Sequence, residues 1–357
     1  MHSVRVGWAA AAGIVLAAWG GRPAAAEIAK AVEEKILAAA PEKATAKPAK
    51  PRKLLVFTQA LGFYHSSIPL AARAVELMGQ KTGAYTATVT DDPAVFDPAT
   101  LGQYDAIFQD QCTGEMLTPK DHADVRKEIG KLNGRLNDKK KPPTPEEAES
   151  LRKQIDELKK RQASLPPAQP REEAYKKALL DFVAGGKGLI GCHAATDCYY
   201  NWKEYGEMIG GYFTGHPYYP IVVRNDDPDH PVNAAFGGQG FSITDEIYVF
   251  GPRNPQPYSR EKQRVLLSID VPATQAKDPK FDPKAGKRED ADYAISWVKT
   301  HGQGRVFYCS FGHQDHIWTN PAILKHYLDG IQWAIGDLKG DATPVPRKTD
   351  APSGGGK

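Results

Sequence analysis

The stretch GKGLIGCHAATD, residues 186–197, decides the fold class of this chain. Its short apolar run, Leu189 and Ile190, is flanked by glycines, which is typical of a buried parallel strand. The run ends abruptly in Cys192 and His193, followed by small residues. Ligands and catalytic groups collect at the carboxyl ends of strands in open α/β sheets. The stretch therefore predicts a polar active site at a strand end, without saying which reaction takes place there.

The segments on either side extend the same pattern. Strands and helices at these spacings predict an α/β fold with a flavodoxin-like, doubly wound, mostly parallel sheet. Beyond His193 the chain is richer in loops, which predicts a C-terminal strand-rich extension closed by an amphipathic helix. The expected strands outside the opening stretch cover 54–57, 85–89, 104–108, 221–223, 247–250, 265–267, 293–298 and 305–310, and the expected helices cover 71–78, 174–183 and 321–335.

Residues 119–170 differ in composition from their surroundings. Thr118-Pro119 and Thr144-Pro145 each place a capping threonine before a proline that the first helical turn tolerates. Apolar side chains recur at helical spacing within both halves, at 125, 129, 132 and 136 and at 151, 155 and 158. This pattern predicts an inserted, charged helical hairpin with a narrow apolar seam. Its charged surface is either a solvated face or an arm for a protein partner or self-association.

The two ends of the chain lie outside the expected domain, residues 53–340. Residues 1–26 have a basic start, an apolar middle and an Ala-Ala-Ala end, which predicts a cleaved signal peptide and a periplasmic or secreted protein. The mature chain has no later apolar segment long enough for a membrane span. Residues 27–52, rich in Ala, Lys and Pro, predict a flexible tether with a possible short helix near residues 31–40. Residues 341–357 predict a disordered tail.

The net charge of the chain limits the kinds of partner that it is expected to bind. Cleavage after residue 26 removes Arg5 and Arg22 and no acidic side chain, so 44 of the 46 basic residues remain against 43 acidic ones. A nearly neutral chain gives no electrostatic case for nucleic acid or for anionic membranes.

Four cysteines in an exported chain could form two disulfides with three full pairings. They are Cys112, Cys192, Cys198 and Cys309, all at or just beyond predicted strand ends. We expect Cys192 to pair with Cys198 or Cys112, and Cys309 to be as readily a buried free thiol. An oxidised Cys192 could not act as a nucleophile.

Histidines follow several predicted strands. His65 follows the first strand, His193 the fourth and His313 the last, so a parallel sheet brings these three to one edge. His216 lies in a glycine-rich segment. Asp245-Glu246, at the start of a predicted strand, adds carboxylates that could orient an imidazole, act as acid or base, or ligate a metal.

Several ordered blocks give the chain a resemblance to a known family. Together they resemble the trehalose-utilization (ThuA-like) family, within the class I glutamine amidotransferase-like superfold, over about residues 53–338. One departure is that His193, not Cys192, stands at the position of the amidotransferase nucleophile. Another is Gln-Asp-His after His313, where amidotransferases have His-Pro-Glu. The blocks are GFYHSSIP (62–69), 188–197, GYFTGHP (211–217), DHPV (229–232), TDEIY (244–248) and GRVFYCSFGH (304–313).

The resemblance implies carbohydrate metabolism, namely the processing of a disaccharide or an oxidised keto-glycoside. Sugars need polar groups and flat aromatic walls, and several aromatic residues flank the candidate site. Imidazoles that titrate near neutrality suit the acid-base steps of keto-sugar chemistry. The aromatic candidates are Tyr64, Tyr199, Tyr200, Trp202, Tyr218, Tyr219 and Trp318.

Our leading hypothesis is therefore an exported carbohydrate-active hydrolase, lyase or isomerase. We expect His193 as general base, Glu246 as the group that orients or assists it, and His216 as a third catalytic residue. Zinc or another divalent ion could be held by three histidines. Substrate binding is expected from His65, His313, Tyr64, Trp202 and Asp245, and the possible metal ligands are His65, His193 and His313.

Two other functions compete with this hypothesis. One is a non-catalytic module that binds a sugar in the same pocket and a partner through the hairpin. The other is an amidotransferase or cysteine hydrolase that uses Cys192 as its nucleophile, activated by His193.

Overall fold

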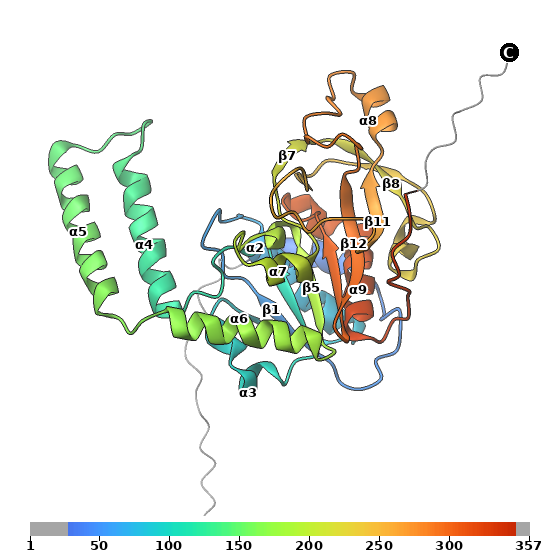
Figure 1. The fold of residues 1–357 in the computed structure, drawn as a ribbon, viewed down its shortest axis with the longest axis horizontal. Coiled ribbons are helices and arrows are strands. Elements are labelled where there is room, and N and C mark those ends of the chain that lie inside the picture. Colours follow the sequence, from blue (N-terminus) through green and yellow to red (C-terminus); the bar gives the residue numbers. More distant parts are fainter. Residues whose placement is uncertain (1–27, 348–357) are drawn as a thin grey trace, which may run out of the picture.

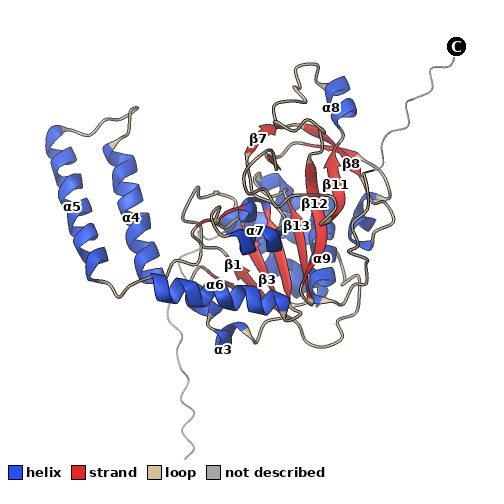
Figure 2. Ribbon diagram, in the orientation of Figure 1, coloured by secondary structure: helices blue, strands red, loops and turns tan. Residues whose placement is uncertain are grey.

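A nine-stranded sheet runs through the centre of the protein (Figures 1 and 2), in a computed structural model that describes residues 28–347. Its strand order is β2-β1-β3-β5-β13-β12-β11-β8-β9. The first five strands of this order are mutually parallel and the remaining pairs are antiparallel. The strands are β1 (Lys53–Phe57), β2 (Thr86–Thr90), β3 (Ala106–Asp110), β5 (Gly188–Cys192), β8 (Ile221–Asn225), β9 (Phe241–Ile243), β11 (Arg264–Ile269), β12 (Ala294–His301) and β13 (Gly304–Cys309).

Two further pairs of short strands lie outside this sheet. Strand β7 (Gly215–Tyr218) pairs antiparallel with β10 (Ile247–Val249), and β4 (Thr113–Gly114) pairs parallel with β6 (Asp197–Cys198). Strands β4 and β6 come shortly after the carboxyl ends of the parallel strands β3 and β5 in the chain, so this pair belongs to the segments at the edge predicted to carry the site.

Helices cover both faces of the sheet, and the alternation of strand side chains explains why. Leu54 and Val56 of β1 pack on one face, whereas Leu55 and Phe57 pack on the other. The first face is covered by α1 (Lys30–Ala39), α2 (Ile68–Thr82) and α9 (Pro321–Ile335), and the second by α6 (Gln169–Ala184) and α7 (Lys203–Ile209). Shorter helices are α3 (Pro98–Leu101), α8 (Val271–Lys277), η1 (Pro93–Phe96), η2 (His193–Thr196), η3 (Pro231–Phe236) and η4 (Asp315–Thr319).

Residues 119–170 include two long helices that stand away from the sheet (Figure 1). These are α4 (Lys120–Leu136) and α5 (Pro145–Ser164), and the side chain of Thr144 caps α5 by accepting the Glu147 amide at 3.2 Å. Of the predicted seam residues, Val125, Leu151 and Ile155 are buried, and the others are partly buried.

The segment before β1 differs from the flexible tether that we expected over residues 27–52. Residues 30–39 form α1, whose Ile36 is fully buried against the core, a contribution of about 1.5–3 kcal/mol. The amide of Thr45 donates to Gln332 Oε1 at 2.8 Å, and Arg52 Nε donates to Asp337 at 2.9 Å. These contacts join the segment to α9 and to the residues that follow it.

Other expectations for the chain ends have mixed outcomes. Residues 341–347 of the expected disordered tail make contacts, because Asp341 pairs with Arg264 at 2.9 Å and Arg347 donates to the Asp290 carbonyl at 2.7 Å. The signal peptide expected at residues 1–26, and residues 348–357, lie outside the described part of the chain. Within residues 28–347, no helix combines the length and apolar character that crossing a membrane requires.

The expected disulfides are absent, since all four cysteines are buried free thiols. Cys192 packs on the α2 and α9 side of the sheet, whereas Cys112 and Cys198 pack on the opposite side. Both pairings that we favoured would have to cross the sheet. Cys198 instead donates to the Cys112 carbonyl at 3.1 Å, and Cys112 donates to the Phe57 carbonyl at 3.2 Å.

Candidate functional site

Four side chains meet at the carboxyl edge of the parallel strands. Each of His65, His193, Glu246 and His313 offers one ligand atom, and all four atoms lie within 4.8 Å of one another. His65 follows β1, His193 follows β5 and His313 follows β13, whereas Glu246 comes from the connection between β9 and β10. We call these four residues the His/Glu cluster.

His193 is held by the turn that directly follows β5. Its backbone has φ of 44°, the left-handed region that side chains other than glycine rarely adopt. Its Nδ1 lies 2.7 Å from the Ser310 carbonyl oxygen. Because a carbonyl only accepts, Nδ1 carries the proton, and the lone pair of the neutral ring is on Nε2. That nitrogen lies 3.6 Å from Glu246 Oε1.

Glu246 is the centre of the arrangement. Its Oε1 is 3.4 Å from His313 Nδ1, and its Oε2 is 3.4 Å from His216 Nδ1. His216 lies on β7 and is 53% exposed, so it borders the cluster from the solvent side. The structure thus brings His216 to Glu246 and leaves it outside the set of four.

Asp245 holds the loop that carries His313. Its carboxylate is buried, with Oδ2 accepting from the Gly312 amide at 2.7 Å and Oδ1 from the Gln314 amide at 2.9 Å. Gly312 has φ of 143°, and a Cβ there would lie 3.4 Å from the His193 Cβ, so a side chain would be both strained and crowded. Asp245, expected to bind substrate, is engaged in positioning this loop.

The surroundings favour the neutral forms of His65 and His313 and the ionised form of Glu246. Burial, together with the neighbouring His193 and His313, lowers the pKa of His65 to about 3. Burial also lowers the pKa of His313. For Glu246, burial alone would raise the pKa, but the contacts with His193, His313 and His216 outweigh it and the net pKa is lowered. Neutral imidazoles and a carboxylate are the forms that ligate metal ions.

Three nitrogens of the cluster have no hydrogen-bond partner among the described residues. They are His65 Nδ1, His193 Nε2 and His313 Nδ1, and all three are buried. Although His193 and His313 lie near Glu246, their contacts with it do not have hydrogen-bond geometry. Buried polar atoms are almost always paired. Three unpaired imidazole nitrogens that converge on one point therefore indicate a ligand that all three would bind. Three imidazole nitrogens and one carboxylate oxygen fit a divalent transition metal.

Aromatic rings form the walls of the site. The Tyr248 ring lies 4.2 Å from the His193 ring and 4.1 Å from that of Phe213, measured between centroids. Phe63, which is 65% exposed, lies 4.8 Å from His65. We had not predicted a role for Tyr248 or Phe63. Tyr248 could have been found, because it lies two residues after Glu246 in the chain, on the short strand that directly follows it.

Two predicted substrate-binding aromatics are placed differently from each other. Tyr64 directly precedes His65 in the chain, and its side chain is exposed. Trp202 instead begins α7 and stacks on Tyr205 at 5.5 Å, within the apolar layer on the α6 and α7 side.

The environment of Cys192 argues against its alternative role as a nucleophile. The side chain is fully buried, and burial raises the pKa of the thiol well above its usual value. Its sulfur accepts from the Tyr327 hydroxyl at 3.3 Å. A reactive cysteine needs thiolate character and access, and this residue has neither.

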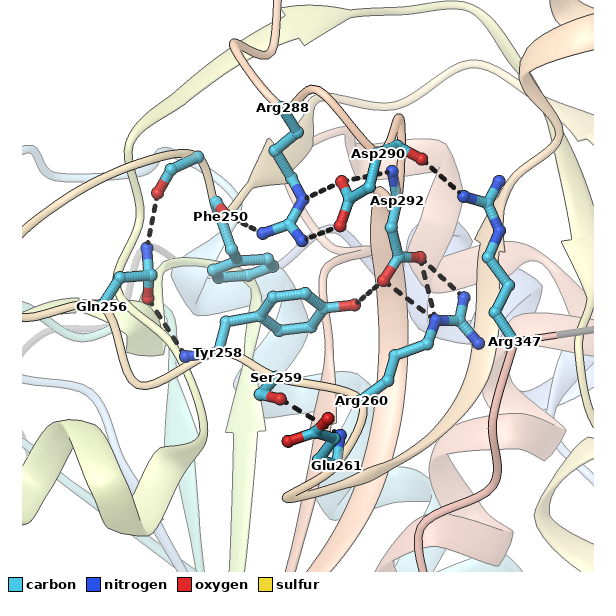
Figure 3. A network of polar contacts seen from close by, with 11 residues as sticks. Phe250, Gln256, Tyr258, Ser259, Arg260, Glu261, Arg288, Asp290, Asp292 and Arg347 are labelled. Carbon is cyan, nitrogen blue, oxygen red and sulfur yellow. Dashed lines mark hydrogen bonds and ion pairs between the residues drawn. The ribbon is translucent and has the colours of Figure 1, made fainter.

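A polar network supports the strand that follows Glu246 (Figure 3). Asp292 accepts from the Tyr258 hydroxyl at 2.8 Å and from Arg260 Nε at 2.9 Å. Arg288 Nη1 donates to the Phe250 carbonyl at 2.9 Å, directly after β10. The network therefore connects the loops between residues 250 and 292 to the strand on which Glu246 depends for its position.

The fold and the cluster define a mixed α/β protein with a His/Glu centre at the carboxyl edge of its parallel strands. A family model described as ThuA, trehalose utilisation, matches residues 146–334, just over half of the chain. The chain belongs to this ThuA family.

A solved structure supports the fold. A ThuA-like protein from Bacteroides uniformis is 18% identical, with a TM-score of 0.52 over 81% of this chain and 94% of its own. A ThuA-like protein from Parabacteroides merdae is 15% identical, with a TM-score of 0.47 over 81% of this chain and 91% of its own. The comparison with curated proteins finds no match.

Proposed function

We propose that the protein is a divalent-metal-dependent enzyme that acts on a carbohydrate, a disaccharide or a keto-glycoside. The observation that carries the proposal is the convergence of three buried, unpartnered imidazole nitrogens on Glu246. The family description, trehalose utilisation, supports the substrate class.

The metal would be held by His65, His193, His313 and Oε1 of Glu246. Four protein ligands complete a tetrahedral zinc site, whereas an octahedral ion such as Mn²⁺ keeps positions open for substrate. When bound, such an ion polarises a sugar oxygen and lowers the pKa of bound water. This assignment changes the role that we expected for His193, because its free lone pair faces the metal position and is not available as a general base.

His216 is then the acid-base residue of the site. It lies outside the ligand set, its Nδ1 is 3.4 Å from Glu246 Oε2, and half of its side chain is exposed to an incoming substrate. In this position it can move a proton between the substrate and solvent while Glu246 orients the ring. Tyr248 and Phe63 supply apolar surface for the sugar.

The test compares His216→Ala with His122→Ala, a histidine at the base of the α4–α5 hairpin, in metal-loaded protein. Both variants should bind metal like the wild type. Turnover of trehalose and of its keto derivative, measured by product chromatography, should fall about 10²–10⁴-fold in His216→Ala, the usual loss of an acid-base group. Unchanged turnover in His216→Ala would refute its role, and a metal-loaded wild type inert toward both sugars would refute the substrate class.

We also propose that the enzyme is exported after cleavage near residue 26. The basic, apolar and small-residue regions of residues 1–26 support this. Expression of the whole chain followed by N-terminal sequencing should give Glu27 as the first residue, and a protein that begins at Met1 would contradict cleavage.

We infer that the parallel half of the sheet is flavodoxin-like, as the resemblance to the glutamine amidotransferase-like superfold implies. Its order, β2-β1-β3-β5-β13, supports this, because it is the order of flavodoxin-like sheets when the parallel strands are numbered along the chain.

A further inference from the structure

A pocket outside the His/Glu cluster remains without a role. It has a volume of about 330 Å³, at the lower end of the range for small-molecule sites. A volume of this size suits one ring-sized unit of a ligand. It is lined by Pro220, Ser242, Ile243, Thr244, His316 and Asn320.

Three separate chain segments connect this pocket to the cluster. Thr244 is two residues before Glu246, His316 is three residues after His313, and Pro220 is four residues after His216. Two residues of chain span at most about 7 Å and three about 10 Å, so the pocket lies close to the cluster. The Asp245 carboxylate fixes this relation, because it binds the Gly312 and Gln314 amides across the two segments.

The lining has no carboxylate, ammonium or guanidinium group and is rich in hydrogen-bonding groups. It offers the hydroxyls of Ser242 and Thr244, the imidazole of His316 and the amide of Asn320, with Pro220 and Ile243 as apolar surface. Asn320 Oδ1 already accepts the Ala322 and Ile323 amides, which leaves its NH₂ group as a donor. A cationic side chain touches the lining at Ser242, where Lys277 Nζ donates to the Ser242 Oγ at 2.6 Å.

An exposed aromatic residue is the chain neighbour of one lining residue. Tyr219 directly precedes Pro220 and is 54% exposed, whereas most aromatic side chains of the described residues are buried. An aromatic face beside hydroxyl, amide and imidazole groups, without a carboxylate or guanidinium in the lining, matches the C–H faces and hydroxyls of a neutral sugar ring.

We propose that this pocket binds the second hexose ring of a disaccharide whose first ring lies at the His/Glu cluster. The inference rests on the proposed function and names the part of the site that selects a disaccharide over a monosaccharide. Thr244 and His316 bind hydroxyls of that ring, and Tyr219 covers one of its faces.

The experiment measures sugar binding calorimetrically in metal-loaded protein, with trehalose, methyl α-glucoside and glucose 6-phosphate as probes. The double variant Thr244→Val/His316→Ala removes two hydrogen-bonding groups and spares Asn320, which caps α9. The matched control is Thr86→Val/His122→Ala, which makes the same changes on β2 and on the hairpin. Metal content is measured for each protein.

We expect the wild type to bind trehalose at least about tenfold more tightly than methyl α-glucoside. The double variant should weaken trehalose binding about tenfold or more, the loss of two hydrogen bonds, and leave methyl α-glucoside binding and metal content unchanged. The control variant should bind both sugars like the wild type.

The outcomes that would contradict the subsite can be distinguished from those that would contradict the proposed function. Binding of both sugars by the wild type, with no change in the double variant, would overturn the subsite while leaving the proposed function intact. Binding of neither sugar would overturn both. Glucose 6-phosphate bound more tightly than methyl α-glucoside, with the gain lost in Lys277→Ala, would overturn the neutral-sugar class.

Discussion

Two buried histidine sites in this protein differ in how their nitrogens are satisfied. His326 of α9 is fully buried, with Nδ1 2.8 Å from the Val232 carbonyl and Nε2 3.0 Å from the Ser296 hydroxyl. His193 is equally buried, but only its Nδ1 has a partner, the Ser310 carbonyl. Burial therefore does not distinguish a structural histidine from a ligand. A ligand histidine is distinguished by a ring nitrogen that has no hydrogen-bond partner and faces other unpartnered groups.

The largest expected effect comes from His193→Ala. Removing one of four ligands should weaken metal binding more than about 100-fold, since even losing a group that only orients a ligand costs 10–100-fold. Metal titration followed by inductively coupled plasma analysis measures this. His326→Gln is the matched control and should retain the wild-type metal content. Equal metal loss in both variants would remove the distinction between the two sites.

His326 should also contribute to a different measurement, the pH dependence of stability. Burial lowers the pKa of His326 from its usual 6.5 to about 4. Between these values the unfolded chain binds the proton and the folded protein does not, so stability falls as pH drops from about 6.5 to 4. The full difference corresponds to about 3 kcal/mol.

Urea unfolding at pH 7 and pH 4.5 tests this prediction. His326→Gln should be less stable than the wild type at pH 7 and should lose less of its remaining stability on acidification. If the variant and the wild type lose the same free energy of unfolding between the two pH values, His326 does not carry this acid sensitivity.

The His/Glu cluster also depends on a residue that positions one of its loops, Asp245, and the substitution Asp245→Asn tests this dependence. Asparagine keeps one oxygen acceptor but presents an NH₂ group to one of the two amides that Asp245 now accepts. The His313 loop should loosen, and metal affinity should fall about 10–100-fold. The Gln332→Glu substitution near His326 on α9 is a fitting control for a charge change and should leave metal affinity unaltered. Metal affinity that Asp245→Asn leaves intact would show that the loop does not need this carboxylate.

Much of the fold could be predicted because the core strands are short apolar runs with clear ends, such as Leu54 to Phe57 and Leu189 to Cys192. The docking of residues 28–52 could not, because it depends on two buried side chains, Ile36 and Ala40, and on partners nearly three hundred residues away. The composition of that segment indicates neither the burial nor the distant partners.

Part of the site could also be predicted from the sequence. Histidines after parallel strands must share an edge, which places His65, His193 and His313 together. The role of Asp245 was hidden, because sequence does not show that its two oxygens face backbone amides of another loop. The cysteines misled for the opposite reason: they are close in the chain or in neighbouring strands, but on different faces of the sheet.

The smallest expected effect is at the α4–α5 hairpin, which serves as a distant reference for both histidine sites. Glu147→Gln removes the partner of Arg135, a partly exposed pair with an N–O distance of 2.7 Å. Exposed pairs contribute less than about 1 kcal/mol, so thermal unfolding should shift little and metal binding should stay constant. A change in metal affinity would show that the hairpin communicates with the cluster.

The most direct test of the central claim is anomalous diffraction at the absorption edge of the metal found in the purified protein. The account predicts one strong anomalous peak bounded by His65 Nδ1, His193 Nε2, His313 Nδ1 and a Glu246 oxygen, at distances of about 2.0–2.2 Å. A peak elsewhere, or a fully ordered cluster whose nitrogens are satisfied by water in metal-supplemented crystals, would contradict it.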